Sequence, residues 1–179
     1  MCNRKFMYER KFGYKKKLIV EPVYKYEIDL EFLDDALSFF VWRSFIETLE
    51  GYNSDAALFT RLLILEARRL SDVLSLTLPQ LNFEDNTIDY SISSINEPIV
   101  APSFLMEKLK KYIQKTQQER GEKAIVFITS KGRQQTRSRF QQLFKYIRFE
   151  GQQLVTPEIL RKTWVLAKHN GYSNEEILK

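Results

Sequence analysis

The chain has 179 residues, of which 44% are hydrophobic, a length and composition typical of a globular domain with a substantial core. Cys2 is the only cysteine and His169 the only histidine, which excludes a disulfide framework and a Cys/His metal cluster formed by this chain alone. No apolar run approaches the roughly 20 residues that span a bilayer, and residues 1–17 lack the apolar core of a signal peptide. We therefore expect no metal site, no membrane segment and a cytoplasmic location.

The net charge of +5 is distributed unevenly along the chain. Residues 1–17 contain seven Lys or Arg against one Glu, so this arm alone carries +6. A second stretch, 131–148, contains six cations and no acid. Such clusters attract the phosphate backbone of nucleic acids, although a solvated face and a frayed tail are the alternative. The residues of this second stretch that we expect to contact DNA are Lys131, Arg133, Arg137, Arg139 and Lys145.

The charge pattern predicts a basic arm over residues 1–17. Hydrophobic periodicity over 18–179 predicts a mainly α-helical domain with a small antiparallel β-sheet (α+β). In chain order we predict an edge strand at 18–26, helices at 30–49 and 54–68, a short helix at 71–76, a small sheet over 82–100, a helix at 103–113, a strand at 123–129, a basic helix at 136–149 and a helix at 156–171. Ser173 then starts a capping-box pattern, and the sequence ends after about one further turn. This ending predicts a domain whose C-terminal part is missing.

Two arginines lie beside predicted helix starts. Arg69 lies at the junction between the helix predicted at 54–68 and the short helix. Arg161 lies in the first turns of the helix that follows Thr156-Pro157. A guanidinium near a helix N-terminus is poorly placed for the helix dipole, but it becomes favourable where an anion binds. The alternative is that both are ordinary surface arginines. The chain has no nucleotide-binding glycine loop and no nucleophile elbow, so its sequence supports neither a nucleotide cofactor nor a conventional triad.

Two segments of the chain resemble the motifs of the tyrosine recombinase (phage integrase) family. Residues 62–76 are similar to its first arginine motif, Gly-Leu-Arg-x-Ser-Glu-Leu-Leu-x-Leu, with matches at Arg69, Ser71, Asp72, Leu74 and Leu76. Residues 156–164 are similar to its second motif, Thr-Pro-His-x-Leu-Arg-His-Thr-Phe, with matches at Thr156, Pro157, Leu160, Arg161 and Thr163. The order and spacing of the motifs extend the resemblance over roughly residues 30–179.

The resemblance implies a reaction that needs no metal or other cofactor. In this family a tyrosine attacks a DNA phosphate and forms a 3′-phosphotyrosyl link, which a DNA hydroxyl later reverses. The transition state spreads negative charge over the phosphate oxygens, and two planar guanidinium groups stabilise that charge. By resemblance, Arg69 and Arg161 are these two groups. The family's nucleophile falls beyond Lys179, so we expect the chain alone to be inactive.

The chain also departs from the family pattern. Glu158 and Lys162 occupy the two histidine positions of the second motif, so both are candidate catalytic residues with altered chemistry. Glu158 adds a negative charge near the expected phosphate, which weakens DNA binding unless it turns away or is protonated. The sheet turn at 91–96 has no lysine where the family places its proton donor, and Lys162 is the candidate substitute, with Lys123 a weaker one.

Three functions remain open from the sequence. The first is the DNA-binding catalytic domain of a site-specific recombinase from a mobile genetic element. The second is an inactive paralogue that binds DNA or regulates recombination. The third is an unrelated basic helical domain that binds a protein partner. For the first we expect double-stranded DNA as partner, a homo-oligomer on DNA in the full-length protein, and association with the nucleoid. No small-molecule substrate is expected.

Overall fold

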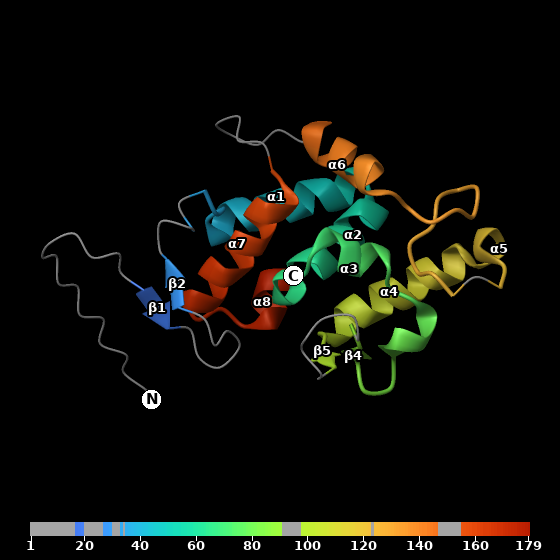
Figure 1. Cartoon of the computed structure of the whole chain (residues 1–179), viewed down its shortest axis with the longest axis horizontal. Coiled ribbons are helices and arrows are strands. Elements are labelled where there is room, and N and C mark those ends of the chain that lie inside the picture. The colour runs from blue at the N-terminus through green and yellow to red at the C-terminus, as the bar shows by residue number, and fades with distance from the viewer. Residues whose placement is uncertain are drawn as a thin grey trace, which may run out of the picture. The chain divides into compact units, whose positions relative to one another are not determined.

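The structure is a computed structural model that describes residues 17–19, 27–29, 33, 35–90, 98–122, 124–146 and 155–179 (Figure 1). The chain divides after Asp34 into two compact units. In the first unit, β1 (Lys17–Ile19) and β2 (Glu27–Asp29) pair as an antiparallel hairpin. The predicted edge strand at 18–26 is confirmed at its first two residues, and its remainder lies outside the described residues. So do residues 1–16 of the predicted arm.

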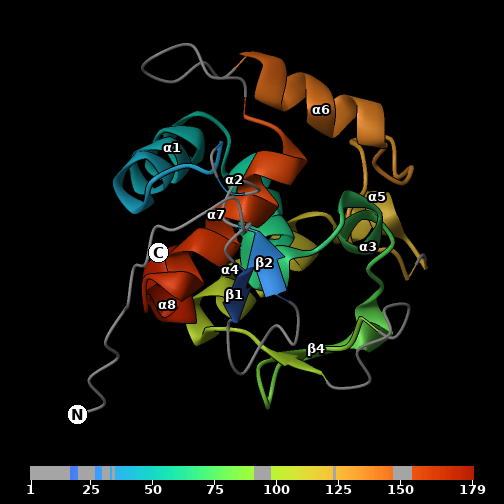
Figure 2. The same cartoon turned by 60° about the vertical axis from the view of Figure 1, so that its left-hand side comes forward.

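The second unit, residues 35–179, is mainly helical with a small antiparallel sheet, which confirms the predicted fold class. Its elements in chain order are α1 (Phe39–Tyr52), α2 (Ser54–Ile64), the 3-10 turn η2 (Leu65–Ala67), α3 (Leu70–Leu74), the 3-10 turn η3 (Leu78–Gln80), β3 (Leu81–Asn82), β4 (Thr87–Ile88), β5 (Ile99–Val100), α4 (Ser103–Lys115), α5 (Gln117–Arg120), α6 (Arg137–Tyr146), α7 (Pro157–His169) and α8 (Asn174–Leu178). Figure 2 shows α2 and α7 near the centre of this unit, with α6 on one side and the sheet on the other.

The core of the unit forms where α1, α2 and α7 pack against one another. In α2, every residue from Ala56 to Ile64 is buried, as expected for a helix that other elements surround. Trp42 of α1 and Trp164 of α7 are fully buried. Burial of a large apolar side chain stabilises a fold by roughly 2–3 kcal/mol. This packing fixes α7, the helix that carries the second predicted arginine.

The first long helix begins later than the predicted residue 30. Ser38 precedes α1 in an extended conformation, and its hydroxyl accepts a hydrogen bond from the Val41 amide at 3.4 Å. The Leu37 amide donates instead to Thr163 Oγ1 on α7, at 2.9 Å. Residues 35–38 therefore run along α7 before α1 starts. The predicted start is wrong because this tertiary contact outweighs the apolar pattern.

The sheet has the order β3-β4-β5 and is antiparallel, as predicted for residues 82–100. The predicted strand at 123–129 is wrong for the residues described, which form only isolated bridges at Ile125 and Ile128. The Val126 amide donates to the Leu76 carbonyl at 2.8 Å, so this segment runs beside the chain that leaves α3. The segments that it pairs with, at Thr77 and Gln134, contribute only one bridge each, so the described residues here form no continuous strand ladder.

Side chains from α1 and α2 hold the end of α8. The capping box predicted at Ser173 is present at the start of this helix. At its other end, Trp42 Nε1 donates to the Ile177 carbonyl at 2.6 Å, and Arg61 Nε donates to the Leu178 carbonyl at 2.7 Å. The last carbonyls of a helix have no partner inside the helix. Two buried side chains supply partners here, and they join α8 to the core.

Aromatic stacking attaches α6 to α2. Phe140 is buried, and its ring stacks on that of Phe59 with centroids 3.6 Å apart. Phe127 meets Phe59 edge-on at 5.0 Å. The edge-on contact of Phe127 adds about 1 kcal/mol to the burial of the rings. The inner face predicted for the basic helix is confirmed at Phe140, which sets the orientation of the cations around it.

Candidate active site

A kink between α2 and α3 presents the first predicted arginine. The chain leaves α2 through η2, in which Glu66 and Ala67 have left-handed φ angles of 55° and 50°. Arg69 follows in an extended conformation just before α3, and the Asp72 carboxylate accepts its backbone amide at 3.3 Å. The Arg69 side chain is exposed and makes no hydrogen bond or ion pair with any residue that the structure describes. Among the described residues, no acceptor therefore competes with an external anion for this guanidinium.

The second predicted arginine lies on α7. Thr156 caps this helix by accepting the Ile159 amide at 3.2 Å, and Pro157 is its first residue. Arg161 is half-buried, and its Nε has no hydrogen-bond partner although that atom is enclosed by protein. A buried donor left without an acceptor costs about 1–3 kcal/mol. An anion or water bound at this guanidinium would remove that cost.

The fold brings the two arginine segments onto neighbouring elements. η2 packs directly against α7, and α2 also lies along α7. Arg69 follows η2 by two residues, and Arg161 lies in the second turn of α7. In Figure 2 the chain passes from α2 to α3 beside α7. Residues 92 positions apart in the sequence are thus carried by segments that contact each other.

The strained backbone of this kink makes a prediction about stability. For an L-residue other than glycine, a left-handed φ costs roughly 1–2 kcal/mol. Ala67→Gly removes this cost but increases the freedom of the unfolded chain, so we expect a net gain of about 0.5–1 kcal/mol in the free energy of unfolding. Urea denaturation measures it. The matched control is Ala57→Gly inside α2, which we expect to lose about 1 kcal/mol. A loss at both positions would contradict the strained conformation.

Unlike the two arginines, Lys162 forms ion pairs with described residues. Lys162 Nζ lies 2.7 Å from Asp35 Oδ1 and 4.0 Å from Glu158 Oε1. The hydrogen bond from Lys162 holds the pKa of Asp35 below its ordinary value. Glu158 is exposed. The ammonium group that sequence comparison offers as a proton donor is therefore bound to a carboxylate at the start of the unit.

The predicted DNA-contacting cations lie on α6 and in the loop before it. Their exposed side chains form no ion pair with any described residue; they are Lys131, Arg133, Arg137 and Arg139. Lys145 also lies in α6, but its side chain falls outside the described set. Gln134 Nε2 donates to the Leu74 carbonyl at 3.0 Å, and this bond fixes the basic loop to α3. We call the exposed cations Lys131, Arg133, Arg137 and Arg139 the basic surface. Because α3 follows Arg69 directly in the chain, the basic surface adjoins the first arginine segment.

Other cations of the domain form ion pairs. Arg61 and Lys108 both bind Glu50, and Lys115 Nζ lies 3.0 Å from Asp55 Oδ2. Exposed ion pairs reduce the field that a cation projects into solvent. These ion pairs therefore reduce the attraction that Lys108 and Lys115 exert on an external anion.

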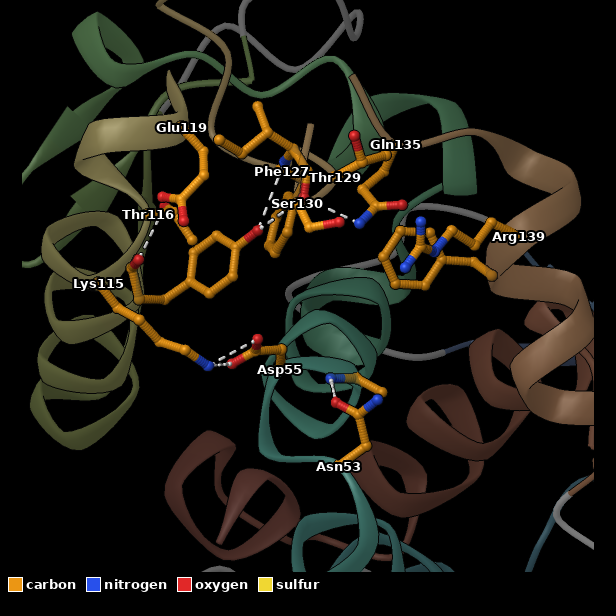
Figure 3. Close-up of a pocket in the computed structure, with 14 residues that line it drawn as sticks. Asn53, Asp55, Lys115, Thr116, Glu119, Phe127, Thr129, Ser130, Gln135 and Arg139 are labelled. Carbon is orange, nitrogen blue, oxygen red and sulfur yellow. Dashed lines mark hydrogen bonds and ion pairs between the residues drawn. The ribbon is translucent and has the colours of Figure 1, made fainter. Parts of the chain in front are cut away.

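A cavity of about 330 Å³ lies beside the basic helix (Figure 3). Its lining includes Arg139 of α6, Glu119, and the Lys115–Asp55 ion pair. Both signs of charge occur at its rim, so it has no general preference for phosphate. The outer surface of α6 is better suited to a DNA backbone than this cavity, and we exclude the cavity from the candidate site.

Sequence reasoning missed the residues that support Arg69. Arg68 is buried at 5% exposure, and its guanidinium lies over the ring of Tyr90, 4.9 Å from the centroid. Burial raises the pKa of Tyr90, so it stays neutral at physiological pH. Two adjacent arginines were the only signal, and sequence alone does not reveal which of them is buried. The sheet turn that follows Tyr90, including residues 91–96, lies outside the described residues, as does Lys123.

The described residues contain neither a metal site nor a membrane-spanning helix. No group of three or more His, Cys, Asp or Glu residues is arranged to hold a metal ion. No helix among these residues is both long and apolar enough to cross a membrane.

Comparison with known proteins places these features in a family. The family model described as "Phage integrase family" matches residues 37–170, which include both arginine segments and all of α6. The virulence plasmid integrase pGP7-D of Chlamydia muridarum is 30% identical over 77% of this chain and 46% of its own length. Its counterpart from Chlamydia trachomatis serovar L2 is 27% identical over 98% of this chain and 59% of its own length.

The chain thus spans about half the length of the curated relatives that it matches. No solved structure matches it significantly. The family model covers well over half of the chain and contains the two motifs on which the sequence resemblance was based. This chain belongs to the phage integrase family of tyrosine recombinases.

Proposed function

We propose that this chain is the DNA-binding catalytic region of a site-specific recombinase, in which Arg69 and Arg161 bind the scissile phosphate. One observation carries the proposal: the segments bearing the two arginines lie on contacting elements, and neither guanidinium has a partner among the described residues. Arg161 adds a buried Nε without an acceptor. The planar guanidinium donor suits the non-bridging oxygens of a phosphate.

The chemistry follows from this arrangement and from the family. A tyrosine hydroxyl attacks the phosphorus, the 5′ oxygen of the DNA leaves and takes up a proton, and a phosphotyrosyl link forms. Arg69 and Arg161 neutralise the charge that builds on the phosphate oxygens in the transition state. A DNA hydroxyl then attacks the link and releases the tyrosine. No step requires a metal or a redox cofactor.

The basic surface supplies the sequence-independent part of the binding. Arg137 and Arg139 project from α6 beside the stacked Phe140, and the preceding loop adds Lys131 and Arg133. Exposed cations without acidic neighbours release counterions when they contact phosphates, and this favours association with double-stranded DNA. A full-length protein acting this way would assemble as an oligomer on paired DNA sites, in association with the nucleoid.

A second candidate is a family member that binds DNA without cutting it. The observation that favours it is the pairing of Lys162 with Asp35, which engages the only lysine of the second motif. Glu158 at a histidine position supports the same interpretation. Covalent trapping of the full-length protein on a nicked duplex separates the two, since only an active enzyme forms the phosphotyrosyl link. The third interpretation, an unrelated protein-binding domain, is wrong because the chain belongs to the integrase family.

The proposal predicts how single arginine replacements change DNA binding. Arg69→Ala and Arg161→Ala should each weaken binding to a short duplex about tenfold, because each removes a charge-assisted contact. The slope of log affinity against log salt should fall by about 1 in each variant. Fluorescence anisotropy between about 50 and 200 mM salt measures both quantities.

Arg43→Ala is the matched control for these variants. Arg43 is an exposed arginine on α1 that pairs only weakly with Glu47, at 3.7 Å. We expect its replacement to change affinity less than twofold, because it lies outside both motifs. If Arg69→Ala and Arg161→Ala behave like Arg43→Ala, the phosphate site is not formed by these arginines.

A further inference from the structure

Two consecutive residues of α7 hold the chain segment that enters the second unit. Lys162 Nζ donates to Asp35 Oδ1 at 2.7 Å, and Thr163 Oγ1 accepts the Leu37 amide at 2.9 Å. Asp35 is the first residue of this unit. Lys162 and Thr163 directly follow Arg161 in the sequence. The arginine that we assign to the phosphate is therefore adjacent in the chain to the two residues that bind the entering segment.

Lys162 shares one side of α7 with Arg161 and Glu158. An α-helix turns by about 100° per residue, so these three side chains fall within a sector of about 100° around its axis. Residues three or four apart on a helix are neighbours, and Lys162 Nζ lies 4.0 Å from Glu158 Oε1. Lysine carries its ammonium group on a flexible four-carbon side chain. An ammonium released from Asp35 can therefore turn toward an anion bound at Arg161.

Asp35 and a DNA phosphate are alternative acceptors for this ammonium. The Lys162 side chain is 12% exposed, whereas that of Asp35 is 48% exposed. An ammonium with little access to water needs an anionic acceptor, because burial of an unpaired charge is costly. A half-exposed carboxylate loses little when its partner leaves, since water solvates it again. Exchange of the pair therefore requires a new acceptor only for Lys162, and a phosphate oxygen supplies one.

We propose that Asp35 is a positioning residue that acts through Lys162: its carboxylate holds the ammonium away from the phosphate bound by Arg161, and release of the ammonium strengthens DNA binding. The inference rests on the proposed function, because it assigns Lys162 to the same phosphate site. Asp35 itself does not touch the DNA. Through this bond, the start of the unit controls the affinity of a site on α7, 127 positions away in the sequence.

The test compares Asp35→Asn with the removal of a similar acid elsewhere. We expect Asp35→Asn to bind a short duplex about fivefold more tightly, because a charge-assisted contact with phosphate is gained. The slope of log affinity against log salt should become steeper by nearly 1, since each neutralised phosphate contributes about 0.9. Fluorescence anisotropy measures both quantities.

Glu175→Gln is the matched control. Glu175 also pairs with a lysine, Lys179, at 2.6 Å, and its side chain is 60% exposed. It lies on α8, outside both motifs and outside the basic surface. Its replacement removes the same charge as Asp35→Asn, and we expect affinity to change less than twofold and the salt slope to stay the same.

A double-mutant cycle with Lys162→Met identifies the route by which Asp35 acts. In the Lys162→Met background, Asp35→Asn should change affinity less than twofold, because no ammonium remains to be released. The direction of the effect is also informative. Loss of an ion pair with a purely structural role weakens binding or leaves it unchanged, so a gain in affinity separates the positioning role from a structural one.

Three results would overturn the inference: unchanged or weaker binding by Asp35→Asn, a gain that persists in the Lys162→Met background, and an equal gain in Glu175→Gln. The proposed function fails on a different observation, namely unchanged affinity in Arg161→Ala alone. Far-ultraviolet circular dichroism and urea midpoints of each variant show that differences in affinity come from folded protein.

Discussion

Replacement of Arg61 by methionine should lower the free energy of unfolding by about 2–4 kcal/mol. Arg61 is only 2% exposed, and its guanidinium bonds to the Leu178 carbonyl at 2.7 Å and to Glu50 Oε2 at 2.5 Å. Methionine preserves much of the apolar stem but supplies no donor, so a buried carbonyl and a partly buried carboxylate lose a partner. Glu50 keeps Lys108 and some solvent exposure, and this limits the loss.

The measurement is urea denaturation at several pH values. Burial opposes ionisation of Glu50, but hydrogen bonds from Lys108 and Arg61 outweigh it and lower its pKa below 4.5. A lowered pKa stabilises the fold above pH 4.5, and that contribution disappears as pH falls through the folded value. The difference between Arg61→Met and wild type should therefore shrink below pH 4.5.

Arg43→Met is the control for the loss at Arg61. Arg43 is 44% exposed and forms an i,i+4 pair with Glu47 at 3.7 Å. Such pairs contribute about 0.3–0.5 kcal/mol, so this variant should remain close to wild type. Equal losses for Arg61→Met and Arg43→Met would mean that the buried ion network does not hold α8 to α2.

Removal of three charges from the basic surface should have the largest effect on DNA binding. The triple variant Arg133→Gln, Arg137→Gln, Arg139→Gln is expected to bind a duplex about a hundredfold more weakly at low salt, at roughly 1 kcal/mol per lost contact. The slope of log affinity against log salt should become shallower by nearly 3, since each neutralised phosphate contributes about 0.9. The three side chains are exposed, so the substitutions should leave stability nearly unchanged.

A control with the same change in net charge separates a local site from a general attraction. Arg43, Lys110 and Lys111 are exposed on α1 and α4, outside both motifs. Their triple replacement by Gln lowers the net charge by the same amount. We expect it to reduce affinity less than fivefold. If the two triple variants weaken binding equally, DNA association follows net charge, and α6 is not the interface.

Local patterns predicted much of this fold because local interactions dominate there. Thr156-Pro157 begins α7, and Ser173 begins α8, through bonds between residues three apart in the sequence. The late start of α1 was not predictable in this way. It depends on Thr163, which accepts the Leu37 amide across 126 positions. Sequence periodicity contains no information about such a contact.

In the candidate site, too, the sequence predicts what local motifs determine but not what long-range contacts determine. Motif spacing identified Arg69 and Arg161, and the structure places their segments on contacting elements. The left-handed backbone at Glu66 and Ala67 was not foreseen, because such angles are expected of glycine and neither residue is one. The pairing of Lys162 with Asp35 also escaped prediction, since acid and base are 127 positions apart.

The bond from Trp42 to Ile177 also has a consequence for the order in which the domain is made. The indole and its acceptor are 135 residues apart, and both belong to the same core. Contacts between such distant positions slow folding, because a long loop must close before they form. During synthesis the first helix emerges from the ribosome long before its acceptor exists. Trp42 of α1 therefore lacks this partner, and can meet chaperones or other nascent chains, until α8 has been translated.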